Sequence, residues 1–386
     1  MAIPFLYSVR SLRVRWKSTV GTVACVALVV AVFVTVMSLA NGLKATYISS
    51  GDPRNLLILR QGSMAESSSQ VTVENVRQAQ FLEGIATDER GERLVSAEIM
   101  VLITLPRVDG GKAHVQVRGL GPQGLKLRPT VHFVEGHMFS PGKRECIVSR
   151  NLASRYPDLH LGNTFRFGKN AWTVVGIMEV SHTAYDSEVW VDADEARKAF
   201  NRTFYGSILL RPVDAAAAQS LKERIERDQR LHLRVLTEAE YYLEQTKTAA
   251  PIRLFGAAMA AIMSLGAAFS AMNTLYASVG ARTRDIGTLR VLGFKPPAIY
   301  ILFVFESLVL GAIGGIVGCL LSLPMHGVAT GTFNWATFAE VAFEFRITPA
   351  LLGAGMLFAL VMGVVGSLLP AGMAARKPVL EALHSV

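Results

Sequence analysis

Four long apolar segments dominate this 386-residue chain and limit the folds open to it. They cover residues 19–40, 254–277, 299–323 and 349–369. A hydrocarbon core of about 30 Å needs roughly 20 apolar residues in a helix, so each segment is long enough to cross a membrane. With 51% hydrophobic and 18% charged residues, the chain is too apolar for an ordinary soluble protein and too charged to lie wholly in lipid. The sequence therefore predicts four transmembrane helices and a large water-soluble domain between the first and the second.

Basic residues gather in the short segments before the first span, between the second and third, and after the fourth. Cytoplasmic segments next to membrane spans carry an excess of Lys and Arg, so these three segments are predicted to be cytoplasmic and the soluble domain external. The high pI of 9.6 then reports membrane orientation rather than a nucleic-acid surface. The basic residues concerned are Arg10, Arg13, Arg15, Lys17, Arg282, Arg284, Arg290, Lys295, Arg376 and Lys377.

The external segment mixes two hydrophobic periodicities. Period-2 runs bounded by Gly, Pro and Asn turns predict strands, and 3.6-residue periodicity predicts helices between them. The three cysteines are spread over two spans and one external position, so no disulfide is expected within this domain. The pattern indicates an α+β domain, with strands at 55–60, 101–105, 114–119, 164–167, 172–177, 188–191 and 207–211, and helices at about 73–82, 149–156, 192–200 and 214–229.

The chain on either side of this domain is predicted to be helical. Thr237 and Glu240 fit a capping box, from which one helix can run as a stalk into the second span. Pro251 interrupts this run, so a kink is expected near the outer membrane surface. Residues 3–17 combine apolar residues with four cations and predict an amphipathic interfacial helix, the alternative being a cationic anchor without a helix.

The segment 281–297 carries five charges between two apolar spans. Ile286, Leu289, Val291 and Leu292 would give a short helix there an apolar side, which predicts a docking surface. The alternative interpretation is a topological anchor without a partner. That interpretation explains the charges but not the apolar side.

Motifs of enzyme chemistry are missing from the sequence. It has no Walker A motif, no HisGluXaaXaaHis zinc motif and no GlyXaaSerXaaGly nucleophile elbow, so neither catalysis nor a metal site is expected. Glu306 is an intramembrane carboxylate, which is a functional-site candidate. Its position near the loop favours a bond to a neighbouring helix or a loop arginine over a substrate or proton site. Small residues four apart predict close helix packing, in a bundle or a dimer, at Gly311, Gly314, Gly315 and Gly318.

Several segments together resemble one protein family. ArgThrArgAspIleGlyThrLeuArgValLeuGlyPhe at 282–294, the GlyAlaIleGlyGlyIleValGly run at 311–318 and the ending at 370–383 are similar to MacB/FtsX/LolC-type ABC transporter permeases, the type VII ABC superfamily. Segments at 135–140, 147–153, 161–165 and 174–177 resemble the extracytoplasmic core domain of that family. The order of one span, an external domain and three spans is also similar.

The resemblance implies a permease subunit that works with a separate MacB/LolD-type ATPase subunit. ATP and Mg would bind to that partner, and no cofactor to this chain. The permease would pair with a second copy of itself or a related permease, and a periplasmic adaptor is a further possible partner. Residues 281–297 would form the coupling helix that contacts the ATPase, through Arg282, Arg284, Asp285, Ile286, Gly287, Leu289, Arg290, Leu292 and Gly293.

The expected architecture is a membrane protein with four transmembrane α-helices, one plus three, and a large α+β extracytoplasmic domain. It would lie in the bacterial inner membrane with both termini in the cytoplasm. The expected segments are an interfacial helix (1–17), the first span (18–41), the external domain (42–250), the stalk and second span (237–280), the coupling helix (281–297), the third span (298–325), a short external loop (326–347), the fourth span (348–371) and a cytoplasmic tail (372–386). By analogy, the external domain divides into a membrane-proximal lobe (45–115 with 206–236) and a distal lobe (116–205).

The leading functional hypothesis is export or extraction of a hydrophobic or amphipathic substrate. ATP-driven motion would pass by mechanotransmission to the external domain. The alternative is an FtsX-like regulator that transmits ATPase motion to a periplasmic cell-wall hydrolase. The sequence contains no motif that identifies the substrate, because such proteins select cargo by surface shape and apolar patches.

Overall fold

The computed structural model describes residues 16–108, 110–180, 183–333 and 340–376. The chain divides into two compact units. The helical unit comprises residues 1–41, 250–328 and 345–386, and the external unit comprises residues 42–249 and 329–344. Residues 1–15 of the interfacial helix expected at 1–17, and the tail beyond residue 376, lie outside the described residues; Trp16 and Lys17 belong to α2.

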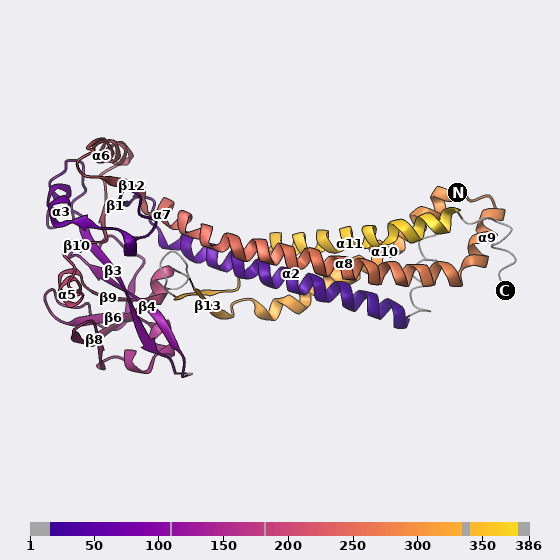
Figure 1. Ribbon diagram of the computed structural model, residues 1–386, viewed down its shortest axis with the longest axis horizontal. Helices are drawn as coiled ribbons and strands as arrows, with labels where there is room; N and C mark the ends of the chain where they lie inside the picture. The colour runs from indigo at the N-terminus through magenta and orange to yellow at the C-terminus, as the bar shows by residue number, and fades with distance from the viewer. Residues whose placement is uncertain (1–15, 109, 181–182, 334–339, 377–386) are drawn as a thin grey trace. The chain divides into compact units, whose positions relative to one another are not determined.

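Four long helices form the helical unit and lie side by side (Figure 1). They are α2 (Trp16–Ser50), α8 (Ala250–Ala281), α10 (Pro296–Ser322) and α11 (Pro349–Arg376). All four belong to helical segments long and apolar enough to cross a membrane, which confirms the predicted spans. Helix α2 ends at Ser50 rather than near residue 41, so its last turns belong to the external unit.

The stalk expected before the second span is a helical run in three parts. Helix α7 (Glu238–Gln245) begins with the predicted capping box, in which Glu240 N donates to Thr237 Oγ1 and Thr237 N donates to a Glu240 carboxylate oxygen. A 3-10 turn (Thr246–Ala249) then precedes α8. Pro251 lacks an N–H and its ring crowds the carbonyl four residues earlier, at Lys247, which explains why the regular helix is interrupted there.

A ten-stranded mixed sheet forms the centre of the external unit. Its order is β12-β1-β11-β3-β4-β9-β6-β8-β5, with β7 paired to β8. All seven predicted strands are present. The strands are β1 (Leu56–Arg60), β3 (Val95–Pro106), β4 (Lys112–Leu120), β5 (His132–Gly136), β6 (Glu145–Ser149), β7 (Thr164–Phe167), β8 (Asn170–Glu179), β9 (Glu188–Asp192), β11 (Ser207–Leu210) and β12 (Leu233–Thr237), with β2 (Val71–Thr72) and β10 (Phe204–Tyr205) forming a separate pair.

The apolar core lies between one face of this sheet and four short helices. These helices are the four that the sequence predicted: α3 (Val73–Gln80), α4 (Arg150–Arg155), α5 (Ala193–Ala199) and α6 (Ala215–Arg227). Successive side chains of a strand point to opposite faces, so Ile99 and Val101 of β3 and Val115 and Val117 of β4 enter this core. The lobe boundary expected near residue 115 falls inside β4, which pairs with β3 along eight residues.

Candidate functional site

The segment between the second and third spans is a short helix, α9 (Thr283–Val291). Arg282 is its N-cap residue, and Gly293 follows it with a φ of +92°. A positive φ is accessible to glycine without steric cost, which explains why the helix ends here. Pro296 then occupies the first turn of α10, where its missing N–H needs no partner.

One side of α9 packs on the transmembrane bundle. Ile286 is 3% exposed and shares an apolar cluster with Val279 of α8 and with Ile299 and Phe303 of α10. Thr283 and Gly287 are also buried. These side chains position α9 against its own chain.

The other side of α9 is accessible. Arg284 and Asp285 are exposed, and Leu289 and Arg290 are half-buried. Beyond the helix, Leu292 is 65% exposed, and Gly293 is also exposed. The structure thus divides the predicted coupling residues into a buried group (Arg282, Ile286, Gly287) and an accessible group (Arg284, Asp285, Leu289, Arg290, Leu292, Gly293).

Glu306 of α10 forms an ion pair with Arg282. Arg282 Nη1 donates to Glu306 Oε2 at 3.1 Å, and both side chains are buried. Arg282 is one of the loop arginines considered above as partners for this carboxylate. A charged side chain among apolar helices is costly unless it is paired, so this contact supplies a structural reason for Glu306.

The predicted packing glycines contact two different helices of the bundle. Gly311 lies against the carbonyl of Ala359, and Gly315 lies against the Ala359 side chain of α11. Gly314 and Gly318 instead face α2, where Gly318 lies against the carbonyl of Ala27. The missing side chains allow the backbones of α2 and α11 to approach α10 closely on two sides.

A cluster of buried charges lies in the external unit, on the sheet face opposite the apolar core. Glu98, Arg118 and Glu188 alternate along β3, β4 and β9 with the core residues Ile99, Val117 and Val189. Each member of this cluster is at most 3% exposed. We call it the ionic cluster; its members are Glu66, Glu98, Arg118, Arg128, Glu188 and Glu238.

Arg118 is the central cation of the ionic cluster. Its Nε and Nη2 donate to the two carboxylate oxygens of Glu188 at 2.7 and 3.0 Å. Its Nη1 donates to Glu66 at 3.0 Å and to Glu98 at 2.9 Å. Arg128 makes a second two-pronged contact with Glu98, at 2.6 and 2.8 Å. Bidentate pairs of this kind have strong directional hydrogen bonds, which favour one arrangement of the strands.

The cluster holds four carboxylates and two guanidinium groups. Because the two cations lie at different distances from each acid, the electrostatic environment differs from one carboxylate to the next. Burial raises the pKa of Glu66 above its ordinary value, and the charge of Arg118 only partly opposes this effect. Burial would also raise the pKa of Glu98, but the charges of Arg128 and Arg118 hold it below its ordinary value. Glu66 therefore binds a proton more readily than Glu98 does.

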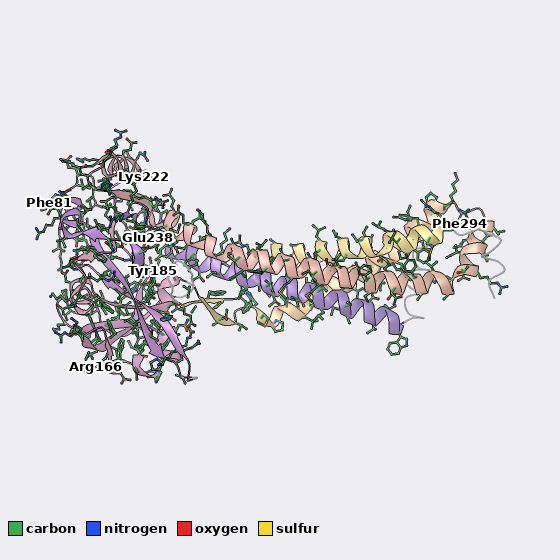
Figure 2. All side chains as sticks on the ribbon, in the orientation of Figure 1. Phe81, Arg166, Tyr185, Lys222, Glu238 and Phe294 are labelled. Carbon is green, nitrogen blue, oxygen red and sulfur yellow. The ribbon has the colours of Figure 1, made fainter. Side chains whose placement is uncertain are left out.

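Glu238 connects this cluster to the ends of two helices. It is the first residue of α7, and its Oε2 accepts hydrogen bonds from Asp52 N at 3.1 Å and Asn55 Nδ2 at 2.8 Å, just after α2 ends. Its Oε1 accepts a hydrogen bond from Tyr185 OH at 2.8 Å, and Figure 2 labels these two residues side by side. Arg128 Nη2 lies 3.6 Å from the same oxygen. One carboxylate at the start of α7 thus binds the segment that follows α2, and Arg128 connects it to Glu98 of the sheet.

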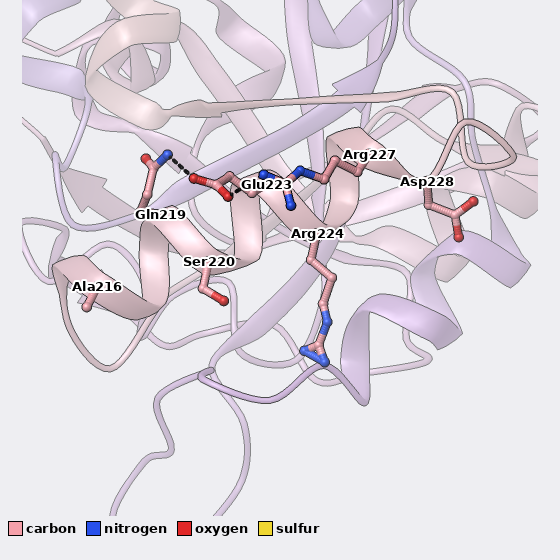
Figure 3. Close-up of a pocket in the computed structure, with 7 residues that line it drawn as sticks. All are labelled: Ala216, Gln219, Ser220, Glu223, Arg224, Arg227 and Asp228. Atoms are coloured by element: carbon pink, nitrogen blue, oxygen red, sulfur yellow. Dashed lines mark hydrogen bonds and ion pairs between the residues drawn. The ribbon is translucent and has the colours of Figure 1, made fainter.

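A shallow hollow on α6 is lined by side chains of that helix and by Asp228 after it. Glu223 accepts hydrogen bonds from Gln219 Nε2 at 2.8 Å and from Arg227 Nη2 at 3.0 Å (Figure 3). These are ordinary pairs four residues apart on a solvated helix face. We assign no function to this hollow.

Sequence analysis did not identify the ionic cluster. Its residues are separated by up to 172 positions, from Glu66 to Glu238. The pairing of β3, β4 and β9 brings Glu98, Arg118 and Glu188 together, and a 3-10 helix (Glu66–Ser68), the β4–β5 connection and α7 add the other three members. Two local signals were available. Glu98 is the one charged residue of strand β3, and Glu238 follows directly after a capping Thr.

An α+β domain between the first and second of four spans defines the class of protein: an ABC transporter permease with a periplasmic domain. Residues 19–228 match the family model described as "MacB-like periplasmic core domain". Residues 257–379 match the model described as "FtsX-like permease C-terminal". The chain belongs to the family of MacB/FtsX-type permeases. It is a multi-pass membrane protein. Both matched descriptions are of permease parts rather than of enzymes.

Three relatives illustrate the similarity. An ABC transporter permease of Methanocaldococcus jannaschii, MJ1507, is 25% identical over 251 residues, which cover 63% of this chain and 62% of the relative. The macrolide export ATP-binding/permease protein MacB 1 of Yersinia pestis is 29% identical over 61% of this chain and 37% of the relative. The permease YknZ of Bacillus subtilis is 25% identical over 64% of this chain and 63% of the relative. The chain thus matches less than two thirds of each relative, and these comparisons do not favour the regulatory alternative.

Proposed function

We propose that this chain is the permease subunit of an export or extraction system powered by a separate ATPase subunit. ATP and Mg bind to that ATPase, and the permease works as a dimer with a second copy or a related permease. It resides in the inner membrane with both termini in the cytoplasm. A periplasmic adaptor would fit the same arrangement. Its substrate is hydrophobic or amphipathic.

The observation that carries this proposal is the position of Glu238. Helix α2 contains the first span, and α7 leads into α8, which contains the second. The segment just after α2 and the first residue of α7 meet at this one buried carboxylate. A displacement of either helix end is therefore transmitted to the sheet through hydrogen bonds that are shielded from water. Stiff helices that are fixed to a soluble domain suit mechanotransmission, in which motion passes outward without a substrate path through the bundle.

The accessible group of α9 residues supports contact with the ATPase. Leu292 and half-buried Leu289 offer apolar surface, while Arg284, Asp285 and Arg290 offer charges of both signs. Apolar anchors supply affinity, and surrounding charges fix orientation. The buried group holds α9 on the bundle, so that a push on α9 reaches α8 and α10.

The experiment is co-purification with the ATPase encoded beside this chain, followed by ATP hydrolysis in lipid nanodiscs. The variant Arg290→Glu with Leu292→Glu changes side chains outside the buried group, so α9 stays folded. We expect loss of the complex and of its activity. Arg376→Glu, at the exposed end of α11, reverses one cation as Arg290→Glu does; it is the control for charge reversal and retains both. A double variant that binds and hydrolyses like the wild type would refute the assignment of α9.

A further inference from the structure

The connection between the third and fourth spans contains a structured hairpin where the sequence predicts only a short loop at 326–347. Strands β13 (Ala329–Phe333) and β14 (Glu340–Glu344) pair antiparallel along five residues. Val341, Ala342 and Phe343 of β14 are each at most 5% exposed. This hairpin belongs to the external unit, although the chain on both sides of it belongs to the helical unit.

Polar contacts hold β14 to the external unit. The carboxylate of Glu340 forms an ion pair with Arg155 of α4, and Arg107 of the β3–β4 turn lies 3.7 Å from its other oxygen. All three side chains are at most about a third exposed. Ala342 N donates to Ser187 Oγ at 2.7 Å, in a 3-10 helix (Ala184–Ser187) that also carries Tyr185 of the Glu238 contact.

Backbone contacts fix the hairpin at its base and against α2. The carbonyl of Glu344 lies against Gly42 of α2 and leaves no room for a side chain there. Phe345 N donates to Val328 O at 3.1 Å, which closes the base of the hairpin between α10 and α11. In the next residue, Arg346 N donates to Ser38 O of α2 at 3.2 Å.

We propose that this hairpin is a positioning element that stays docked on the external unit during the ATPase cycle, and that Glu340 and Ser187 hold it there. The hairpin then links α10 and α11 to the unit that also receives α2 and α7. The role rests on the proposed function, because it assigns a path for ATPase-driven motion. Short chain connections from two spans and three polar contacts from separate elements make the hairpin stiffer than an open loop.

A reversible cross-link tests whether docking persists. Ser187→Cys with Ala342→Cys is built in a background where Cys25 and Cys319 are replaced by Ala; Cys146 stays because it is fully buried. In the complex with the ATPase, oxidation joins the two introduced cysteines. The rate of ATP hydrolysis is then expected to stay within twofold of the rate of the reduced protein. Loss of hydrolysis that a reductant reverses would show that the hairpin must undock, which overturns the proposal.

Charge reversal tests whether the hairpin carries motion. Glu340→Arg places a third cation beside Arg107 and Arg155, so the hairpin should lose this contact. We expect the ATP-induced change in hydrogen–deuterium exchange of β9 to fall at least threefold. The ATPase should still co-purify with this variant. Glu340→Arg with Arg155→Glu restores the change, because the pair is re-formed in reverse. The control Glu179→Arg reverses an exposed carboxylate of the same unit and has no effect.

The two proposals fail in different ways. A wild-type chain that binds no ATPase would overturn the proposed function, and the role of the hairpin with it. A wild-type chain that binds the ATPase, together with a Glu340→Arg variant that exchanges like the wild type, would overturn the role of the hairpin alone. A merely structural hairpin would lower thermal stability without changing the ATP-induced exchange.

Discussion

Replacing Arg118 by Met removes the central cation of the ionic cluster and keeps a side chain of similar length. Three carboxylates, those of Glu66, Glu98 and Glu188, then lose hydrogen bonds of 2.7 to 3.1 Å while they remain buried. Removing one partner of a buried ion pair typically costs about 3–5 kcal/mol, because the other charge is left uncompensated. Since three acids are affected here, we expect the upper end of this range.

This loss is large compared with the stability of a folded domain. Typical domains unfold with a free energy of about 5–15 kcal/mol. For a domain of about 150–250 residues, 1 kcal/mol shifts the unfolding midpoint by roughly 2–4 °C. Arg118→Met is therefore expected to lower the midpoint of the external unit by about 10 °C or more.

Cys146 supplies the assay in the full-length protein. It is the one cysteine among the described residues of the external unit, it is fully buried, and burial raises the pKa of its thiol, so it reacts with a fluorogenic maleimide only when the unit opens. Cys25 and Cys319 are replaced by Ala so that labelling reports this position alone. The labelling rate is measured along a temperature ramp.

A control variant and a compensating variant test this prediction. Arg230→Met removes an exposed cation that pairs with Asp228, two residues before it, and it should leave the midpoint unchanged. Adding Glu66→Gln and Glu188→Gln to Arg118→Met removes two of the three orphaned charges and should recover part of the loss. If Arg118→Met shifts the midpoint no more than Arg230→Met does, the cluster does not stabilise the sheet and the reasoning is wrong.

Three further perturbations follow from the same contacts. Because the pKa of Glu66 is raised in the folded state, its contribution to stability is fully present below the ordinary carboxyl pKa and is lost as pH rises through the folded-state pKa. Glu66→Gln should therefore reduce the drop in the Cys146 labelling midpoint that accompanies a rise in pH above the ordinary carboxyl pKa. A Cβ at Gly318 would lie 2.6 Å from a backbone oxygen of α2, so Gly318→Ala should destabilise the bundle by about 1–3 kcal/mol in thermal aggregation assays, whereas Gly353→Ala, which meets nothing within 4 Å, should not. Arg282→Leu removes the cation that pairs with the Glu306 carboxylate and should lower the aggregation temperature. Adding Glu306→Gln removes the unpaired charge and should restore most of the lost aggregation temperature.

Local patterns were sufficient to predict the spans and most elements of the external unit. Apolar length identifies a membrane helix, and the capping box of Thr237 lies within four residues, so neither depends on the rest of the chain. The extent of α2 was not predictable in the same way. Its last residues, from Gly42 to Ser50, are less uniformly apolar than the span, and they continue the helix because the external unit packs around them: Leu43 and Tyr47 are at most 3% exposed.

The ionic cluster shows where sequence reasoning stops. A Glu in a strand usually indicates a solvated face, and Glu98 follows the alternation that such a face requires. The face is buried instead, because α7, the end of α2 and the β4–β5 connection cover it, and these elements come from distant parts of the chain. The hairpin at 329–344 was missed for the same reason, since its order comes from contacts with residues such as Arg155 and Ser187.

The ionic cluster and the hairpin indicate that the two faces of the sheet in the external unit have different roles. The apolar face, with α3 to α6, carries the folding energy expected of an ordinary core, and among the described residues its core cluster contains none from a membrane-spanning helix. The opposite face carries the charges, and the end of α2 and the start of α7 bind there. The hairpin between α10 and α11 reaches the same 3-10 helix that holds Tyr185. Hydrogen-bonded charges are directional in a way that apolar contacts are not, so this face is the one that the proposed mechanotransmission would use to pass on the direction of a helix displacement.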